Sequence, residues 1–168
     1  RSLIRFVQSI AFVFEHAPLI RELCGTLYIW ARKPPVPGSR RPWISLARHH
    51  ELFGSTSVVV PSHNEEMNVG PLVEALLHLY GDYIHEIIFV NDNSADRTPE
   101  VTREIARRHP RVRLLDRRPP NGVGLALRDG CAAATGRYVL TMDCDFVQIL
   151  PEIGDLFDAI AAGRDGAI

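Results

Sequence analysis

Asp143 and Asp145 are the residues whose type and spacing most directly suggest chemistry. They stand one residue apart at the end of the apolar run 138–142. Such a run is typical of a buried strand, and ligands of open parallel sheets bind beyond the carboxyl ends of their strands. Two carboxylates at that edge are suited to holding a hard divalent cation against a diphosphate. The pair alone is a weak signal, because many short acidic pairs only solvate a loop.

Two more polar loops follow apolar runs in the same way. The segment 91–96, Asn-Asp-Asn-Ser-Ala-Asp, follows the run 87–90, and the segment 61–65, Pro-Ser-His-Asn-Glu, follows the run 58–60. Parallel strands end at one edge of their sheet, so these loops would meet there. We therefore expect a ligand site built from loops at the carboxyl edge.

The elements that must position these loops alternate regularly from residue 55 onward. Strands are expected at 56–60, 84–90, 111–115 and 137–142, and helices at 66–80, 98–109, 123–134 and 151–162. Thr98 followed by Pro99 favours a helix start, with Thr as the cap and Pro as the first helical residue. The alternation predicts a Rossmann-like α/β fold, with a mostly parallel sheet covered by helices on both faces.

Composition limits the function classes. The chain has 168 residues, of which 46% are apolar and 23% charged, as in one globular domain or one domain with an appendage. Residues 1–53 hold eight Lys/Arg against three Asp/Glu, a balance of +5, and residues 54–168 hold eleven against seventeen, a balance of −6. The basic head suits an anionic membrane surface, whereas the acidic body argues against nucleic-acid binding. No uninterrupted apolar stretch reaches the ~18 residues of a membrane span.

Three segments follow from these patterns. Residues 1–31 are expected to form an amphipathic helical segment, residues 32–54 a Pro/Arg-rich linker, and residues 55–168 the α/β domain. The chain begins with Arg and ends in residues 166–168, which resemble an opening strand. We therefore expect the chain to be part of a longer protein and the domain to be truncated.

Several motifs in a fixed order resemble a known family. They are Val-Val-Pro-Ser-His-Asn-Glu-Glu (59–66), Ile-Ile-Phe-Val-Asn-Asp-Asn-Ser-Ala-Asp-Arg-Thr (87–98), Asn-Gly-Val-Gly-Leu-Ala-Leu-Arg-Asp-Gly (121–130), Ala-Thr-Gly-Arg-Tyr (134–138) and Met-Asp-Cys-Asp (142–145). Over about residues 56–168 the chain resembles the inverting family 2 glycosyltransferases of GT-A fold, nearest the dolichyl- or polyprenyl-phosphate mannosyltransferase branch. The resemblance implies that residues 55–168 are the nucleotide-sugar-binding half of a GT-A glycosyltransferase domain.

The resemblance implies roles for individual residues. Asp143 and Asp145 would be catalytic and would bind Mg²⁺ or Mn²⁺, with Gln148 as a further metal ligand. Asp92 would accept hydrogen bonds from the base or ribose of the nucleotide. The residues implied to contact the nucleotide sugar are Pro61, His63, Glu65, Val90, Asp92, Asp143, Cys144 and Asp145.

The resemblance also implies substrates and a location. The donor would be a nucleotide sugar of the GDP-mannose or UDP-glucose type, and the acceptor a polyprenyl or dolichyl phosphate. The protein would then lie at the cytoplasmic face of a membrane, either peripherally or through transmembrane segments outside this chain. The sequence departs from the family at Asn91, where an acid is usual, at His63, where an aromatic residue is common, and at Val147, where Gln is frequent.

Simpler interpretations stay open beside these. Asp92 and Asp96 would serve equally well as turn residues that bond their own backbone, and Asn64 and Glu65 would suit a helix start. The segment 143–147 loosely fits the motif of haloacid-dehalogenase-like phosphatases, although that family carries it on its first strand. A nucleotide-sugar phosphate transferase, or a domain that binds a nucleotide sugar or a partner without transfer, is a further alternative.

Overall fold

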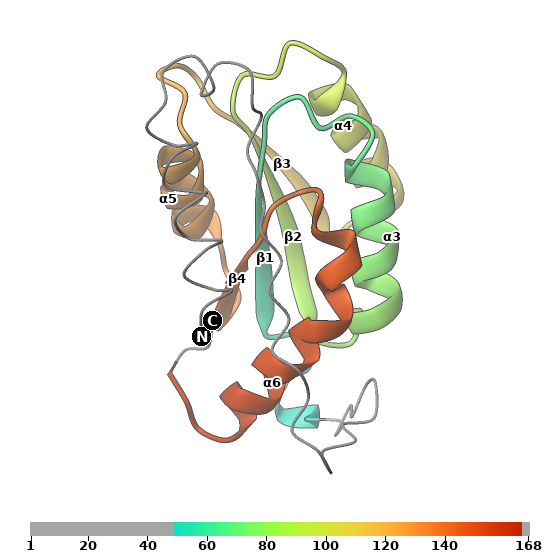
Figure 1. Cartoon of the computed structure of the whole chain (residues 1–168), viewed down its shortest axis with the longest axis vertical. Helices are drawn as coiled ribbons and strands as arrows, with labels where there is room; N and C mark the ends of the chain where they lie inside the picture. Colours follow the sequence, from blue (N-terminus) through green and yellow to red (C-terminus); the bar gives the residue numbers. More distant parts are fainter. Residues whose placement is uncertain (1–48, 166–168) are drawn as a thin grey trace, which may run out of the picture. The chain divides into compact units, whose positions relative to one another are not determined.

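The parallel sheet expected from the sequence is present (Figure 1). The computed structural model describes residues 49–165, in which the strands run in the order β3-β2-β1-β4 and every pairing is parallel. The strands are β1 (Thr56–Ser62), β2 (Ile84–Asn91), β3 (Val112–Asp116) and β4 (Tyr138–Thr141). The helices are η1 (His50–Leu52), α3 (Val69–Tyr80), α4 (Thr98–Arg108), α5 (Val123–Ala133), η2 (Phe146–Ile153) and α6 (Gly154–Ala161). The predictions for residues 1–31, most of the linker and residues 166–168 lie outside the described range.

Helices cover both faces of the sheet (Figure 1). The helices α3, η2 and α6 pack over one face, where the fully buried side chains include Val58 and Phe89. The helix α5 covers the other face, over Val59 and Ile88. Successive strand residues point to opposite faces, so strands buried on both sides need the unbroken apolar runs that the sequence shows. Within residues 49–165, no helix is long and apolar enough to span a bilayer.

Most predicted boundaries are confirmed, but the predicted cap of α4 was wrong: Arg97 is the N-cap residue and Thr98, rather than Pro99, is the first residue of the helix. Each strand agrees with its expected range within two residues, and α4 and α5 each end one residue early. The expected helix 66–80 begins late, because residues 66–68 form a hydrogen-bonded turn and α3 starts at Val69. The Glu66 amide in that turn binds the Asp96 carboxylate instead of continuing the helix backward.

The expected helix 151–162 was wrong at its start. The structure has a 3₁₀ helix, η2, that contains Pro151, and the α-helix α6 begins only at Gly154. The reason is Tyr80, whose hydroxyl donates to the Leu150 carbonyl at 2.6 Å and accepts from the Gly154 amide at 3.1 Å. These are the two groups that a continuous α-helix would join to each other, so the inserted hydroxyl separates the two helical segments.

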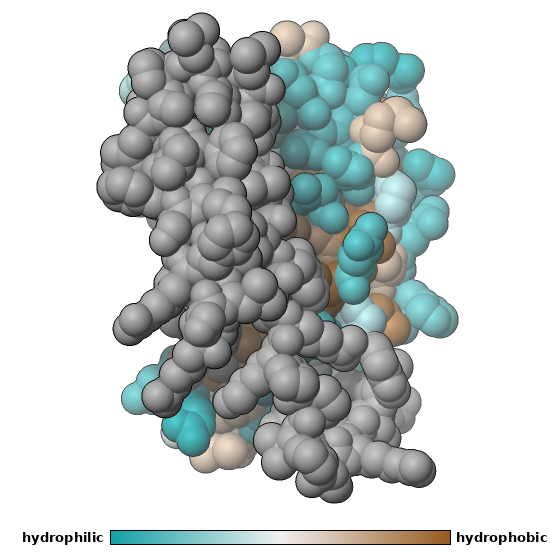
Figure 2. All heavy atoms as spheres, viewed as in Figure 1, coloured by the Kyte–Doolittle hydropathy of each residue, from teal (hydrophilic) through white to brown (hydrophobic). Residues whose placement is uncertain are grey.

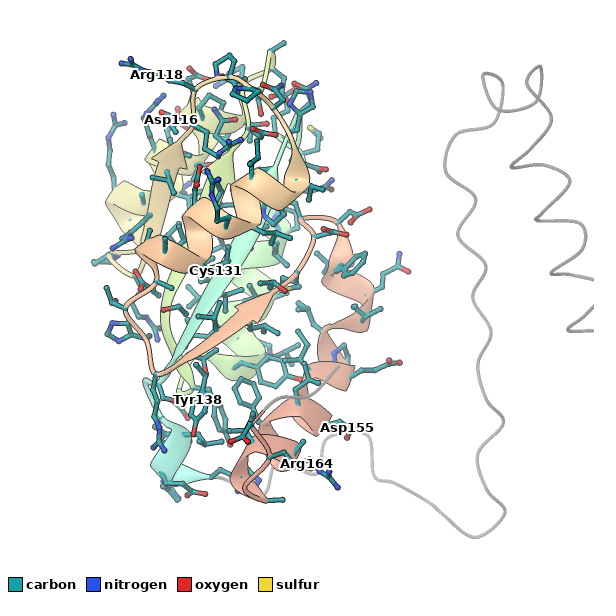
Figure 3. The ribbon with its side chains drawn as sticks, turned by 90° about the vertical axis from the view of Figure 1, so that its left-hand side faces the viewer. Asp116, Arg118, Cys131, Tyr138, Asp155 and Arg164 are labelled. Carbon is teal, nitrogen blue, oxygen red and sulfur yellow. The ribbon has the colours of Figure 1, made fainter. Side chains whose placement is uncertain are left out.

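An apolar groove lies at the amino end of the sheet. Side chains of β4 and α6 line it, including Tyr138, Leu140 and Phe157. Figure 3 shows Tyr138 near the end of the molecule that carries Asp155, whereas Asp116 lies at the opposite end. The groove is therefore remote from the polar loops that follow β1, β2 and β3.

Candidate active site

Three loops meet at the carboxyl edge of the sheet. Loop 1 (residues 63–68) follows β1, loop 2 (residues 92–97) follows β2, and loop 3 (residues 117–122) follows β3. Ser62 pairs with Asn91, and Asn91 pairs with Asp116, so these three strands end side by side. Hydrophilic side chains gather at this end in Figure 2, over α4 and the loops before α3 and α4. The clustering expected from the sequence is confirmed for loops 1 and 2, and loop 3 joins them although the sequence analysis did not include it.

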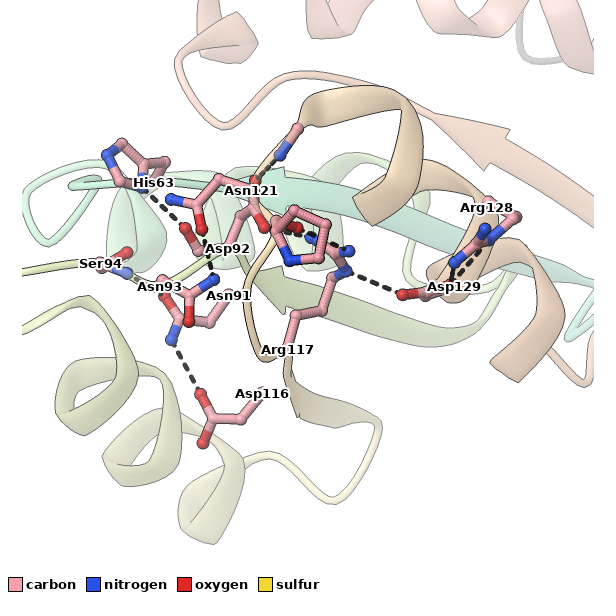
Figure 4. Close-up of polar contacts among 12 residues, drawn as sticks. His63, Asn91, Asp92, Asn93, Ser94, Asp116, Arg117, Asn121, Arg128 and Asp129 are labelled. Carbon is pink, nitrogen blue, oxygen red and sulfur yellow. Dashed lines mark hydrogen bonds and ion pairs between the residues drawn. The ribbon is translucent and has the colours of Figure 1, made fainter.

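Asp92 is the buried acid of this edge (Figure 4). Its side chain is 9% exposed and forms an ion pair with Arg117, while its second oxygen accepts from the Gly122 amide at 2.6 Å. Arg117 also donates to Asp129 on α5 at 2.8 Å. That hydrogen bond, aided by Arg128, lowers the pKa of Asp129, so the acid remains an anion beside Arg117.

The Asp92 carboxylate therefore joins loop 2 to loop 3, and Arg117 extends the connection to α5. Its charge is balanced within the protein, and its orientation is fixed by donors from loop 3. Each carboxylate oxygen has two lone pairs, so one acceptor position on each oxygen remains after these contacts. Asp92 is thus able to accept a hydrogen bond from a ligand without breaking its ion pair.

Asn91 explains one departure from the resembled family. Its side-chain amide donates to Asp116 at 2.8 Å, and its carbonyl oxygen accepts from the Ser94 amide at 3.2 Å. An ionised acid at this position only accepts, and it would face the Asp116 carboxylate with a like charge. The amide is therefore the side chain that this pairing needs.

His63 lies on loop 1 and is exposed to solvent. Its Nδ1 lies 2.8 Å from the backbone carbonyl oxygen of Asp92. A carbonyl oxygen only accepts, so Nδ1 carries the hydrogen and Nε2 of the neutral ring is an acceptor. Pro61 and Glu65 beside it are half-buried, and Glu65 accepts from Asn68 at 2.5 Å.

Asp143 and Asp145 are both exposed and flank Cys144, which is 1% exposed. Burial, together with the carboxylates of Glu65, Asp145 and Asp143, raises the pKa of Cys144 to about 12. Cys144 is therefore a neutral packing thiol at physiological pH. The Asp-x-Asp segment begins beside β1, because Thr141 pairs with Val59 and the Met142 amide donates to the Val59 carbonyl at 3.2 Å.

The two exposed carboxylates fit a divalent cation that is completed by a ligand. Among residues 49–165, no three His, Cys, Asp or Glu side chains form a ready-made metal site. Mg²⁺-type ions commonly use one or two protein carboxylates and take their other ligands from water and substrate phosphates. The donor set of Asp143 and Asp145 matches that pattern. Gln148 is exposed on η2, three residues beyond Asp145.

Two expected contact residues have buried side chains. Val90 is fully buried between the sheet and α5, and Cys144 is buried in the other core. A ligand at the loop edge would therefore meet only the backbone of these two residues. Of the six other expected contacts, Pro61, His63 and Glu65 lie at the end of β1 or in loop 1.

The sequence analysis missed several residues that organise the site. Arg117, Asp129, Thr98 and Asn121 each bind a polar group of another loop or helix. Thr98 entered the sequence analysis only as a helix cap, and Asn121 and Asp129 only as parts of the motif 121–130. The local signal for Arg117 was the basic pair with Arg118 directly after the third strand. The partners of Arg117 are distant in sequence, so the pairing emerges only from the fold.

Comparisons with known proteins identify the family. Residues 57–168 match the family described as glycosyl transferase family 2. A dolichyl-phosphate β-glucosyltransferase from Trichomonas vaginalis is 31% identical over 129 residues, which cover 73% of this chain and 38% of that protein. A dolichol-phosphate mannosyltransferase from Pyrococcus furiosus is 32% identical over 67% of this chain and 32% of its own length. A dodecaprenyl-phosphate galacturonate synthase from Rhizobium johnstonii is 37% identical over 66% of this chain and 31% of its own length.

The chain thus spans about a third of the length of these curated relatives. Among solved structures, glucosyl-3-phosphoglycerate synthase from Mycobacterium tuberculosis, in complex with Mn²⁺, UDP and glucosyl-3-phosphoglycerate, has a TM-score of 0.54 at 23% identity. That alignment covers 66% of this chain and 40% of the synthase, and it shows the shared GT-A fold. On the match over residues 57–168, this chain belongs to glycosyltransferase family 2.

Proposed function

We propose that this domain binds the donor in a metal-dependent, inverting glycosyltransferase. The donor is a nucleotide sugar of the GDP-mannose or UDP-glucose type, and the acceptor is a polyprenyl or dolichyl phosphate. The observation that carries the proposal is the pair of exposed carboxylates, Asp143 and Asp145, which follow β4 beside β1 at the sheet edge that also holds Asp92. The names of the relatives, which include dolichyl- and dodecaprenyl-phosphate sugar transferases, support this choice of acceptor.

The nucleotide is recognised by loops 1 and 2. Asp92 accepts a hydrogen bond from the base or ribose through a free lone pair, and His63 offers Nε2 as a second acceptor. Pro61 and Glu65 form the wall beside them. Because the Arg117 ion pair already balances the charge of Asp92, a neutral sugar or base suits this position better than a phosphate.

The diphosphate belongs at Asp143 and Asp145, with Gln148 as a further proposed ligand of the cation. These residues would hold Mg²⁺ or Mn²⁺, which neutralises the negative charge that develops on the departing diphosphate. The carboxylates themselves would repel a bare diphosphate, so donor binding at this position is expected to depend on the cation. The neutral Cys144 thiol adds no charge to the site.

The acceptor needs little activation if it is a lipid phosphate. A phosphate monoester has a second pKa of ~6, so it is already a dianion for the most part at neutral pH. The protein then has to hold the acceptor in line with the anomeric carbon, on the face opposite the diphosphate, which gives inversion. An enzyme with this acceptor would work at the cytoplasmic face of a membrane, which agrees with the basic balance of residues 1–53.

The test is donor binding by the Asp-x-Asp variants. Asp145→Asn is expected to abolish Mn²⁺-dependent binding of the nucleotide sugar, and Asp143→Asn to weaken it strongly, with the fold unchanged because both side chains are exposed. Calorimetry with GDP-mannose and UDP-glucose measures the affinity. Glu152→Gln is the matched control, since Glu152 is an exposed acid on the adjoining helix η2.

If Asp145→Asn keeps the Mn²⁺-dependent affinity for the nucleotide sugar, the proposed metal site is contradicted. If the full-length protein binds the nucleotide sugar but does not transfer the sugar in the presence of Mn²⁺, the alternative of a non-catalytic donor-binding domain is favoured instead. The phosphatase alternative has no support from the fold, since the Asp-x-Asp segment follows the fourth strand rather than the first.

A further inference from the structure

Loops 1 and 2 are joined by hydrogen bonds that run in both directions. Loop 1 amides donate to side chains of loop 2 and of the first residue of α4: Asn64 to Ser94 at 3.0 Å, Glu65 to Thr98 at 2.7 Å and Glu66 to Asp96 at 3.1 Å. Loop 2 amides donate back: Ala95 to the Asn64 side chain at 2.8 Å and Arg97 to the Glu66 carboxylate at 3.1 Å. Three consecutive residues of loop 1 are thus held by groups about thirty positions away.

Asp96 and Thr98 form the centre of this network. The Thr98 hydroxyl accepts a hydrogen bond from the Glu65 amide and donates one to the Asp96 carboxylate at 2.5 Å. The same carboxylate oxygen accepts from the Thr98 amide at 3.0 Å, and the other oxygen accepts from the Glu66 amide. Thr98 is completely buried. Water therefore has no access to replace its hydroxyl as the partner of Glu65.

The backbone of both loops agrees with a fixed arrangement. Asn64 and Asn93 have a φ of 58°, in the left-handed region that costs most residues energy and that Asn tolerates best after Gly. Each Asn side chain is also bound: Asn64 to Ala95, and Asn93 to Asn121 of loop 3 at 2.7 Å. Loop 3 is therefore connected to the same network.

We propose that Asp96 is a positioning residue of the donor site, which acts through Thr98 and the amides of Glu65 and Glu66 to hold loops 1 and 2 as one preorganised surface. This inference rests on the proposed function, because the surface it orders carries His63, Glu65 and Asp92. A loop that is already ordered loses less conformational entropy when the nucleotide binds. Asp96 affects affinity without a contact to the ligand.

Variants of loop 2 and α4 test this role against a simple loss of stability. Asp96→Asn loses one of its acceptor oxygens, and Thr98→Val loses the hydroxyl that links Glu65 to Asp96. Thr98→Ser restores that hydroxyl. Thr102→Val is the matched control: Thr102 is also completely buried on α4, but its hydroxyl donates only to the Thr98 carbonyl within the helix, at 2.8 Å.

The measurements are calorimetric affinity for GDP-mannose or UDP-glucose with Mn²⁺ and amide hydrogen exchange, both on the full chain at a temperature where every variant is folded. We expect Asp96→Asn and Thr98→Val to weaken binding by roughly five- to tenfold, as loss of one net hydrogen bond would. The Glu65 and Glu66 amides should exchange faster in these variants. Thr98→Ser should recover most of the affinity, and Thr102→Val should keep it.

The outcomes separate the inference from the proposed function. If the parent chain binds the donor and Thr98→Val binds it as well as Thr102→Val does, Asp96 has no positioning role and the proposed function stands. If the parent chain binds neither donor, the proposed function fails and this inference fails with it. Faster exchange at Glu65 and Glu66, together with the selective loss of affinity, is the result that supports the inference.

Discussion

At the residue scale, the structure separates two aspartates that the sequence left equivalent. Asp96 does bond its own backbone two residues on, at the Thr98 amide, as a turn residue would. Asp92 does not, because its carboxylate binds Arg117 and Gly122 from loop 3. The turn interpretation is therefore correct for part of the role of Asp96, and it does not account for Asp92.

Asp92→Ala is expected to weaken nucleotide binding independently of the metal. We expect the binding free energy of GDP or UDP in a chelating buffer to become less favourable by roughly 1–3 kcal/mol, the cost of a lost buried polar contact. Calorimetry of parent and variant measures the change. Asp129→Asn is the control, since it also removes a partner of Arg117 but leaves the Asp92 carboxylate in place. Equal affinities in parent and Asp92→Ala would show that the acid only supports the loop.

Residue identities at the site could be proposed from the sequence, but their partners could not. Asp143 and Asp145, which the sequence placed beyond the end of a strand, follow β4 and are exposed. The pairing of Asn91 with Asp116, and of Arg117 with Asp92, joins positions 25 apart that meet only when β2 and β3 lie side by side. No local periodicity records such a contact.

At the element scale, the alternation of apolar runs and amphipathic helices determined nearly all of the fold. Strands buried on both faces must be apolar throughout, so 58–60 and 87–90 were recognisable. The exception, the division between η2 and α6, depends on the hydroxyl of Tyr80, 70 positions before the Leu150 carbonyl that it binds. A side chain inserted from a distant helix leaves no trace in local propensity.

Gly130 is where α5 approaches the sheet most closely. A Cβ added there would lie 2.4 Å from a Val59 methyl group and 2.7 Å from a Val90 methyl group, and β-branched side chains have little rotamer freedom to move away. We expect Gly130→Ala to lower the free energy of unfolding by about 1–3 kcal/mol, as overpacking of a core does. Urea denaturation measures the change.

Gly124 supplies the control for this prediction on the same helix. A Cβ at Gly124 meets no atom within 4 Å, so Gly124→Ala should leave stability unchanged or raise it by up to ~1 kcal/mol through helix propensity. A Gly130→Ala variant as stable as Gly124→Ala would mean that α5 shifts away from the sheet at little cost.

Glu86 makes the stability of the sheet depend on pH. Burial raises the pKa of Glu86, but hydrogen bonds from Thr135 and Ser57 and the charge of Arg113 outweigh burial and hold the pKa below its usual value. A depressed carboxyl pKa stabilises the fold above the unfolded-state pKa of ~4.3, and the contribution disappears as the pH falls through the folded-state pKa.

The Glu86→Gln variant tests this dependence. We expect the free energy of unfolding of the parent to fall more steeply than that of Glu86→Gln as the pH is lowered from about 5 to 3. Thr135→Val, which removes the hydroxyl that donates to Glu86 at 2.7 Å, should lie between them. Parallel pH profiles for the three proteins would show that Glu86 contributes nothing to acid sensitivity.

At the scale of the whole molecule, the charges are divided along the chain. Residues 1–53 carry a balance of +5 and residues 54–168 one of −6, and the Arg/Lys pairs at 32–33 and 40–41 lie in the basic part. A helix with a strong apolar face more often packs on protein than on lipid, so the amphipathic pattern at 2–16 alone does not indicate a membrane. The positive charge gives the separate reason to expect an anionic surface.

We expect the basic head to bind anionic vesicles. Each cation near an anionic leaflet contributes about 1 kcal/mol, and salt screens this attraction because the Debye length shrinks from ~10 Å at 0.1 M to ~3 Å at 1 M ionic strength. The chain should therefore sediment with vesicles that contain phosphatidylserine, less with neutral vesicles, and less again in high salt. Replacing Arg32, Lys33, Arg40 and Arg41 by Gln should abolish the difference.

Arg107→Gln with Arg108→Gln is the charge control, because both arginines are exposed at the end of α4 in the acidic part of the chain. If that pair weakens vesicle binding as much per charge as the four changes in the head do, net charge alone governs binding and the head is not a membrane-binding segment. Equal sedimentation with neutral and anionic vesicles, or with neither, would assign the apolar face of residues 2–16 to a protein contact. An enzyme that takes a lipid phosphate gains from a head that binds lipid, since the acceptor is then confined to the surface where the donor site lies.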